Sequence, residues 1–428
     1  MDRAAYTREI ARRLGRRKLV YFGTRGADAR TLLDVPNFEC AFSQIAPMGN
    51  SFVDEVCLET IIGRRVDLDV YNIDQDSSAA VEEIRDALLS ALREDSAVLP
   101  YRSCALLASA WFPRSERALF LGNFHEHQAC FEHKPWVETQ LAAAGVETVP
   151  WRYFGDRERE YILEMLSERA LVVRANRSDG GSGVRFVRSA ADLESQWPEH
   201  SDGFLAVAPL IEGPSINANA VVFPDGLVSH HGISVQLIGT PGCTDRHFGY
   251  CGNDFATASE LPAETLSSIE AMVSRVGSWL ACRGYLGAFG VDAILSHGRV
   301  FLVEVNPRFQ GSSRLASRLD ARFDRADMFL AHMGAFLGLG RPDTQSCAEV
   351  ARRPVGAHVV IHTSASRVAR CPSPQPSVGE VDLVPEDRVM LDRGAIEVDL
   401  VFGEAITTDG RELAPIGRLA VEAWHSHE

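Results

Sequence analysis

The stretch GAFGVDAILSHGRVFLVEVNPR, residues 287–308, decides the fold of this chain. Its two apolar runs flank the polar turn 296–299, which predicts a β-hairpin with buried strands. Three oxygen-bearing side chains interrupt the runs: Asp292, Glu304 and Asn306. Because Glu304 and Asn306 are two residues apart, they point to the same face of a strand. Pairing across the turn is expected to place Asp292 beside them.

Two carboxylates and one amide oxygen form the all-oxygen set that Mg²⁺ prefers when phosphate oxygens complete its shell. A simpler alternative places the carboxylates on the solvated face of a sheet. That alternative conflicts with the position of Glu304 inside the run VFLVEV, where a carboxylate without a partner is costly. We therefore predict that Asp292, Glu304 and Asn306 bind a metal, either Mg²⁺ or Mn²⁺.

Composition sets the broad class of the protein. A chain of 428 residues, 46% hydrophobic and 24% charged, is expected to form two to four packed units. A net charge of −15 argues against a nucleic-acid partner. No apolar run reaches the roughly 18 residues of a membrane span, and the charged N-terminus does not resemble a signal peptide. Nine scattered cysteines without a Cys-x-x-Cys pair predict reduced thiols and a cytoplasmic location.

The order of apolar and polar segments predicts several units. The N-terminal part alternates strand-like runs (19–26, 38–45 and 66–72) with a helical pattern at 78–93, which is typical of a small open α/β domain. Short strands and turns dominate the C-terminal end, and residues 339–353 look like a linker. We expect four units, 1–125, 126–203, 204–345 and 346–428, the last of them β-rich.

Cations and glycines in the middle of the chain predict a phosphate-binding site. Lys134 precedes Pro135 at an expected helix start, where anions are favoured. Arg174 ends an apolar strand and can pair with a phosphate. It is followed by a loop whose backbone N–H groups can approach phosphate oxygens closely. The loop residues concerned are Gly180, Gly181, Ser182 and Gly183.

Three further segments complete the predicted site. The apolar run 204–213, which includes Leu210 and Ile211, is expected to meet an adenine edge through its backbone, with Glu212 reaching a ribose. Residues 230–255 are rich in glycine and polar residues and are expected to form a long loop facing the substrate, which makes Arg246 a candidate catalytic residue. Arg308 follows Asn306 and is expected to steady charge on a transferring phosphate.

These motifs resemble the ATP-grasp superfamily over residues 125–345. The resemblance rests on Lys134-Pro135-Trp136, the strand–glycine loop–strand at 171–187, the run LIEG at 210–213, and the hairpin motifs around Asp292 and at 304–308. It implies an ATP-grasp fold of α/β and α+β units, in which ATP lies between two α+β subdomains. An N-terminal open α/β domain precedes these subdomains, and a small β-rich C-terminal unit follows them.

The same resemblance implies residue roles and a reaction. Lys134 and Arg174 hold the phosphates of ATP, Arg308 stabilises the intermediate, and the acidic hairpin binds Mg²⁺. ATP phosphorylates a carboxylate, an amine attacks the acyl phosphate, and ADP and phosphate leave. The implied partners are a small-molecule carboxylate and an amine, each an amino acid or a peptide. A homodimer stays open.

The finer assignment leaves alternatives. The run RANRSDGG at 174–181 looks most like the peptide-forming ATP-grasp ligases of bacterial natural-product pathways, of the pheganomycin peptide ligase type. Arg174 departs from the lysine that is usual there, and the adenine segment lacks the frequent acid before it. A biotin-carboxylase-like or purine-pathway-like enzyme is the alternative, and a non-catalytic ATP-binding regulator is the hypothesis from another class.

Overall fold

The computed structural model describes most of the chain, with gaps. The described residues are 1–46, 53–63, 86, 95–104, 119–176, 180–181, 183–198, 203–352, 356–362, 377–378, 381–382, 384–389, 395–400, 405–415, 417–418 and 421–422. The predicted strand 66–72, nearly all of the predicted helix 78–93, and Ser182 lie outside these residues.

A parallel sheet forms the N-terminal part, as the alternating pattern predicted. Its five strands run in the order β3-β2-β1-β4-β5, so β1 lies between β2 and β4. The apolar run of β1 is buried, which fits a strand covered on both faces. The elements here are α1 (Arg3–Leu14), β1 (Lys18–Arg25), η1 (Gly26–Asp34), β2 (Phe38–Ile45), β3 (Glu55–Cys57), α2 (Leu58–Ile62), β4 (Ser96–Pro100) and β5 (Leu119–Phe120).

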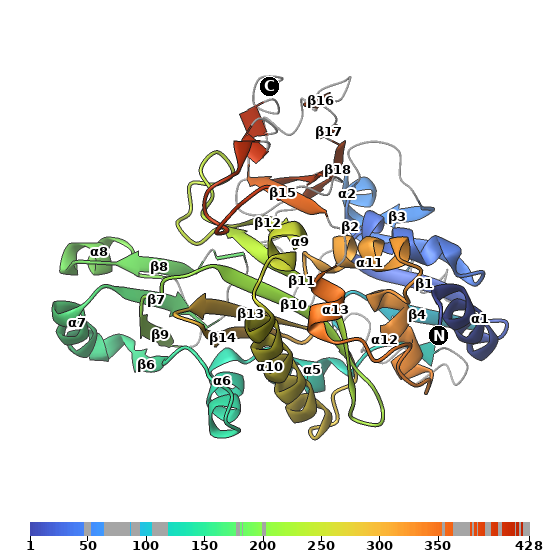
Figure 1. Ribbon diagram of the computed structural model, residues 1–428, viewed down its shortest axis with the longest axis horizontal. Helices are drawn as coiled ribbons and strands as arrows, with labels where there is room; N and C mark the ends of the chain where they lie inside the picture. Colours follow the sequence, from blue (N-terminus) through green and yellow to red (C-terminus); the bar gives the residue numbers. More distant parts are fainter. Residues whose placement is uncertain are drawn as a thin grey trace.

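A second, smaller sheet lies at the opposite end of the molecule (Figure 1). It is antiparallel, in the order β6-β9-β7-β8, and packs its apolar residues against two helices. The chain reaches it through α5 (His125–Phe131) and α6 (Lys134–Ala143). Its elements are β6 (Arg152–Gly155), η3 (Asp156–Glu158), α7 (Arg159–Glu168), β7 (Leu171–Ala175), β8 (Val184–Val187), α8 (Ala190–Ser195) and β9 (Phe204–Pro209).

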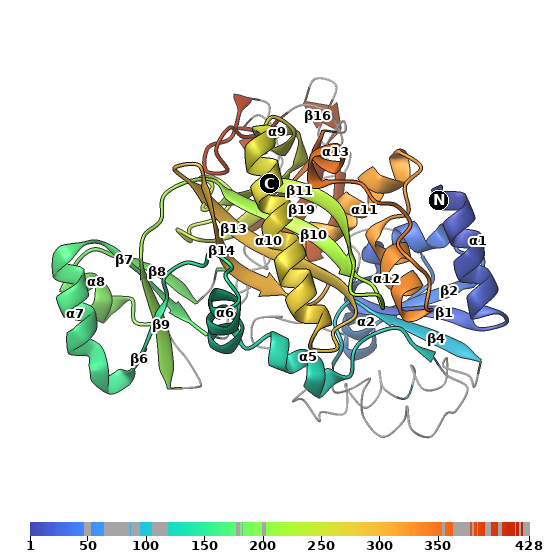
Figure 2. The same cartoon turned by 60° about the horizontal axis from the view of Figure 1, so that its bottom comes forward.

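The central sheet has eight strands in the order β14-β13-β10-β11-β12-β15-β19-β18. Helix α10 lies across it and closes a large apolar core (Figure 2). The elements are β10 (Ser215–Val222), β11 (Val228–Ile238), β12 (Tyr250–Asp254), α9 (Phe255–Ser259), α10 (Ala263–Ala281), β13 (Gly287–Ser296), β14 (Arg299–Asn306), α11 (Ser313–Arg322), α12 (Met328–Phe336), α13 (Cys347–Ala351), β15 (Ala357–His362), β18 (Val384–Val389) and β19 (Ala395–Leu400). A separate short pair is formed by β16 (Ser377–Val378) and β17 (Val381–Asp382).

The hairpin predicted at 287–308 is present as β13 and β14. Its turn places His297 at φ 49 and Gly298 at φ 73, as a two-residue hairpin turn of the I′ type requires. Because β10 pairs with β13 on the other side, β13 lies inside the sheet and β14 forms its outermost strand.

The prediction of a long irregular loop at 230–255 is wrong. Most of it is strand, in β11 and β12, and only 239–249 forms the connecting turn. Several polar side chains that suggested a loop are buried in β11 instead, His230 and His231 among them. Sequence reasoning also missed α11, whose polar residues read as a loop, and α13, which lies in the expected linker.

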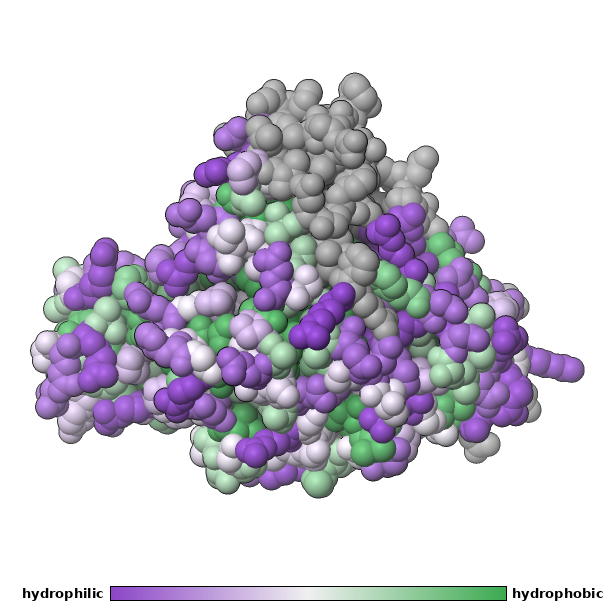
Figure 3. Space-filling model, viewed as in Figure 1, coloured by the Kyte–Doolittle hydropathy of each residue, from purple (hydrophilic) through white to green (hydrophobic). Residues whose placement is uncertain are grey.

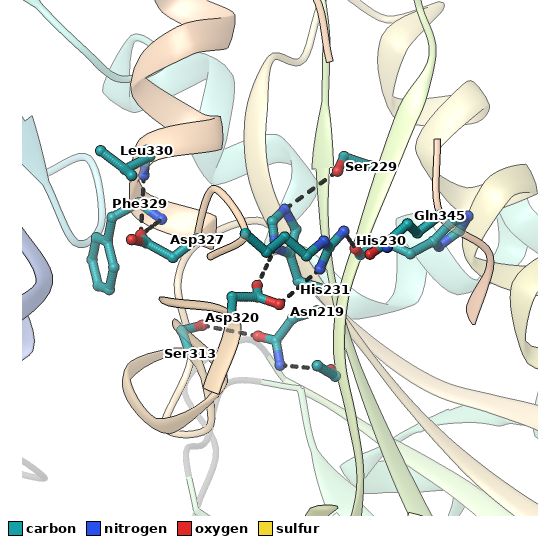
Figure 4. A network of polar contacts seen from close by, with 12 residues as sticks. Asn219, Ser229, His230, His231, Ser313, Asp320, Asp327, Phe329, Leu330 and Gln345 are labelled. Carbon is teal, nitrogen blue, oxygen red and sulfur yellow. Dashed lines mark hydrogen bonds and ion pairs between the residues drawn. The ribbon is translucent and has the colours of Figure 1, made fainter. Parts of the chain in front are cut away.

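Buried polar residues of β11 are satisfied by partners from α11 and the segment after it. His231 Nδ1 lies 2.7 Å from Asp320 Oδ2, and Arg325 Nη1 lies 2.8 Å from Asp320 Oδ1. Arg325 Nε reaches Asp343 at 2.8 Å, so one guanidinium joins two carboxylates. Figure 4 shows this network beside the hydrogen bond from Ser313 to Asn219. Contacts at both ends of α11, from Ser313 and from Asp320, therefore hold this helix on the central sheet.

One apolar core joins the N-terminal sheet to the central part of the chain. Residues of α1, β1 and β4 share this core with Phe223, Phe309 and residues of α12. Phe309 and Phe329 stack with their ring centroids 4.3 Å apart. The two parts are therefore packed as one body.

The surface gives no sign of a membrane-spanning segment in the part of the chain that is described. None of its helices is both long and apolar enough to cross a bilayer. The face seen in Figure 3 carries mostly hydrophilic side chains with scattered hydrophobic ones.

Candidate active site

The three predicted metal ligands meet on the β13–β14 hairpin. Asp292 pairs directly with Glu304 in the strand register, followed by a bulge, and Asn306 pairs with Gly290. Asn306 Nδ2 donates to Asp292 Oδ2 at 3.0 Å, so the two side chains touch. The amide oxygen of Asn306 is then the atom left for a metal. Both acids and the amide come from adjacent strands, as their spacing predicted.

Two amides that sequence reasoning did not assign hold the other oxygen of Asp292. Asn217 Nδ2 of β10 donates to Asp292 Oδ1 at 2.7 Å, and Gln236 Nε2 of β11 donates at 3.0 Å. Asn217 lies inside a buried strand. A polar amide within such an apolar run was the sequence signal that could have identified it as a site residue. These donors fix the carboxylate in one orientation.

The electrostatic surroundings of Asp292 favour a cation beside it. Burial, and then the charge of Glu304, raises the pKa of Asp292 to about 6, although hydrogen bonds from Asn217 and Asn306 oppose the shift. A carboxylate shifted in this way is stabilised by a nearby cation. Among the described residues, no three His, Cys, Asp or Glu side chains gather as a metal site, so the donor set needs the Asn306 amide. Two hard carboxylates with an amide fit Mg²⁺.

Lys134 places a positive charge beside the carboxylates of the hairpin. It begins α6, with Pro135 next in the first turn, and its Nζ lies 3.2 Å from Glu304 Oε1. Its side chain is only 11% exposed. A phosphate placed against the acidic hairpin would therefore meet Lys134 as well.

Arg174 lies deeper than predicted and already has a partner. Its Nη2 is 2.8 Å from Glu138 Oε1, and its guanidinium stacks on Trp151 at 4.2 Å from the ring centroid. Tyr153 donates to the same carboxylate at 2.6 Å. Burial raises the pKa of Glu138, and Arg174 opposes that rise. Arg174 Nε and Nη1 are buried without a hydrogen-bond partner among the described residues, so this edge can still take a phosphate oxygen.

Replacing Glu138 with Gln is expected to lower the free energy of unfolding by about 3 kcal/mol, because it leaves the buried Arg174 charge uncompensated. Denaturant unfolding measures the change. The matched control is Glu168→Gln, at a side chain 68% exposed, which is expected to unfold like the unmodified chain. Equal stability of the two variants would contradict a structural role for the pair.

The glycine loop meets the turn between β11 and β12. Tyr250 N donates to Gly180 O at 3.3 Å, and the Phe186 ring stacks on the His247 ring at 5.1 Å. Gly181 has φ +78, and a Cβ there would lie 2.0 Å from Phe248 O. Glycine is therefore required for this approach. Arg246 belongs to the same turn, so the structure places it beside the loop rather than on the hairpin.

The remaining predicted residues lie around the hairpin. Leu210 and Ile211 are half-buried and Glu212 is exposed, in the segment after β9. A Cβ on Gly213 would lie 1.9 Å from Leu295 O, so this segment runs along the end of β13. Arg308 Nη1 donates to Phe309 O at 3.1 Å, and its Nε lies 4.0 Å from Glu132 Oε1.

Comparisons with known proteins agree with this geometry. Residues 134–312 match the family described as an ATP-grasp domain. A search of curated proteins finds no match. Several solved structures are similar in fold at low sequence identity.

The first is the biotin carboxylase domain dimer of Hydrogenobacter thermophilus 2-oxoglutarate carboxylase, in complex with MgADP, ADP and bicarbonate. It is 16% identical with a TM-score of 0.60, and the match covers 96% of this chain and 89% of that one. Campylobacter jejuni biotin carboxylase with an ATP ligand is 15% identical with a TM-score of 0.60, covering 91% and 89%.

The third is N5-carboxyaminoimidazole synthetase from Staphylococcus aureus, complexed with ADP. It is 9% identical with a TM-score of 0.56, and the match covers 91% of this chain and 94% of that one. Similarity at such low sequence identity shows a shared fold and does not identify the substrate. Residues 134–312 thus match the ATP-grasp domain family, and the chain has the ATP-grasp fold.

Proposed function

We propose that this protein is an ATP-dependent carboxylate–amine ligase that forms an amide bond. The observation that carries the proposal is the pairing of Asp292 with Glu304, touched by Asn306 on one side and by Lys134 on the other. An acidic, all-oxygen hairpin next to a lysine suits a metal-bound polyphosphate, because each group supplies the charge that the other lacks.

The proposed nucleotide site lies between the small sheet and the central sheet. The hairpin ligands Asp292, Glu304 and Asn306 would hold Mg²⁺, which shields phosphate charge and polarises the transferred group when bound. The residues proposed to hold ATP are Lys134, Arg174, Gly180, Gly181, Ser182, Gly183, Leu210, Ile211 and Glu212.

The proposed reaction has two steps. A carboxylate oxygen of the first substrate attacks the γ-phosphorus of ATP, the bond to the β-phosphate oxygen breaks, and ADP leaves. The amine of the second substrate then attacks the carbonyl carbon of the acyl phosphate, loses a proton, and displaces phosphate. Arg308, next to the hairpin, stabilises the charge on the acyl phosphate, and Arg246 contributes from the turn that meets the glycine loop.

The finer assignment is to peptide-type bond formation on amino acids or peptides. It is supported by the run at 174–181, which resembles peptide-forming ATP-grasp ligases. The free cysteines of the described part fit a cytoplasmic enzyme. We also propose that the chain forms a homodimer and consists of four units, 1–125, 126–203, 204–345 and 346–428.

Incubation of the protein with ATP, Mg²⁺ and pairwise pools of amino acids tests the function. Phosphate and ADP are expected in at least one pool, together with a product whose mass is the sum of two amino acids less one water. Formation of pyrophosphate and AMP would exclude the acyl-phosphate route. Silence in every pool would exclude amino acids as the substrates.

A second candidate is a carboxylating enzyme that uses bicarbonate. It is favoured by the match over 96% of this chain to a biotin carboxylase domain whose complex contains bicarbonate. ATP turnover that requires bicarbonate and no amino acid would support this candidate against the peptide ligase.

A further inference from the structure

A group of buried charges outside the proposed nucleotide site lies where the N-terminal sheet meets the central part of the chain. Arg25 is the last residue of β1, and Asp28 follows it in η1. Arg314 comes from the first turn of α11, on the other side of this junction. All three are buried, with exposed fractions of 5%, 1% and 3%. Buried charges of this kind need partners.

The three residues form one contact group. Arg25 Nη2 lies 2.9 Å from Asp28 Oδ1, and its Nε lies 3.5 Å from Asp28 Oδ2. Arg314 Nε lies 3.8 Å from Asp28 Oδ1. One carboxylate therefore lies between two guanidinium groups and orients both of them.

Arg25 lies at the edge of the parallel sheet where ligands commonly bind. Strand β1 has parallel neighbours on both sides, β2 and β4, so the chain order reverses there. In open parallel sheets, ligands bind outside the carboxyl ends of the strands at this reversal. Arg25 ends β1, and Tyr101 directly follows β4. Both therefore lie at that edge.

A chain of contacts links this edge to the metal ligands. Ser312, two residues before Arg314, donates to Asn217 Oδ1 at 2.7 Å, and Asn217 donates to Asp292 at 2.7 Å. On the sheet side, Phe309 N donates to Tyr101 O at 3.3 Å. The loop that follows the acidic hairpin thus runs along the ends of β1 and β4.

The electrostatic surroundings of two tyrosines show the same proximity. Burial is the main cause that raises the pKa of Tyr101, and the charges that also act on it are the carboxylate of Asp28 and the guanidinium groups of Arg308, Arg25 and Arg314. Burial likewise raises the pKa of Tyr250, and both Arg25 and Asp292 lie near enough to act on it. A Cβ on Gly311 would lie 3.0 Å from the Tyr250 hydroxyl, so this phenol lies against the loop between hairpin and α11. The Arg25 group and the acidic hairpin therefore face one region.

We propose that Arg25 and Arg314, oriented by Asp28, bind an anionic group on the amine substrate. The anion is a carboxylate, as on a free amino acid, or a phosphate monoester, since guanidinium forks bind both. This inference rests on the proposed ligase function. It assigns Arg25 and Arg314 to substrate binding and leaves nucleotide binding to other residues. An amine substrate anchored there would direct its amino group toward the hairpin, where the acyl phosphate forms.

The test measures the melting temperature of the full chain loaded with MgADP. Each common L-amino acid is compared with its methyl ester, and O-phosphoethanolamine with ethanolamine. At least one anionic amine is expected to raise the melting temperature while its neutral counterpart does not. The first pair to respond identifies a carboxylate, and the second pair identifies a phosphate. The comparison uses the unmodified protein, so it does not depend on any variant folding.

Variants locate the site. Arg25→Gln and Arg314→Gln are each expected to weaken binding of that amine about tenfold or more, the effect of losing a charged hydrogen bond. Arg25→Lys is the second variant if Arg25→Gln does not fold. Arg322→Gln, at the exposed end of the same helix, is the matched control and is expected to bind normally. All of these variants are expected to bind MgADP as the unmodified chain does.

Three results would overturn the inference: equal binding of an amine and its neutral counterpart, normal binding by the Arg25 and Arg314 variants, or no response to any anionic amine. A failure of MgADP to bind would instead overturn the proposed ligase function. The amine panel would then be run on the nucleotide-free protein, where the same comparison decides the inference separately.

Discussion

Glu304→Gln is expected to lower kcat by at least about 100-fold, the largest effect of any single change at the proposed site. The substitution keeps the size of the side chain and removes one of the two facing carboxylates. A neutral amide binds a hard divalent cation more weakly, and Lys134 loses its partner at 3.2 Å. Because the Glu304 side chain is 24% exposed, the fold is expected to persist.

Phosphate release with the active substrate pair measures this effect, and circular dichroism checks the fold. Glu147→Gln is the matched control, because Glu147 pairs with Arg299 at the far end of the same hairpin and is 37% exposed. It is expected to retain full turnover. Undiminished kcat in Glu304→Gln would remove the acidic hairpin from the chemistry. A protein that binds ATP with no turnover in any variant would instead fit a regulator.

Gly181→Ala is expected to lower kcat/KM for ATP by about 10- to 100-fold. A Cβ at this position would lie 2.0 Å from Phe248 O, and the backbone already has φ +78. A left-handed conformation costs a non-glycine residue roughly 1–2 kcal/mol, and the clash with backbone adds to it. The glycine loop would then no longer approach the turn that carries Arg246, and bound nucleotide would be less shielded from water.

Gly203→Ala separates the effect of backbone strain from the effect of the clash with Phe248. Gly203 has a similar φ of +75, with nothing within 4 Å of a Cβ, so the variant carries the conformational strain without the clash. It is expected to change kcat/KM for ATP less than about threefold. Steady-state kinetics at varied ATP gives both values. Equal losses in the two variants would show that backbone strain, rather than contact with Phe248, explains the effect.

The hairpin was predictable from sequence because its determinants are local. Alternation, the turn at His297 and Gly298, and the register that pairs Asp292 with Glu304 all follow from residues within 287–308. The glycine loop and the helix start at Lys134 are local signals of the same kind. The ATP-grasp resemblance rested on these elements, and the expected ATP-grasp fold is present.

Strand β11 and helix α11 were not predictable, because their polar residues are satisfied by distant partners. His231 is buried against Asp320, and Asp320 is bonded to Arg325. Each side chain alone reads as a surface residue. Arg174 shows the same limit, since its partner Glu138 lies 36 residues earlier in the chain. Local patterns identify charged residues but do not show what neutralises them.

The apolar core shared by α1, β1, β4 and α12 has a consequence for protein engineering. Phe309 and Phe329 stack inside it, and Phe309 directly follows the hairpin arginine Arg308. Exchanging the N-terminal sheet for that of another protein with this fold would expose these rings or meet them with unmatched side chains. Chimaeras intended to change specificity must therefore carry α12 and the loop around Phe309 together with the sheet. The small sheet with the glycine loop has its own core, and it is the part suited to exchange as a module.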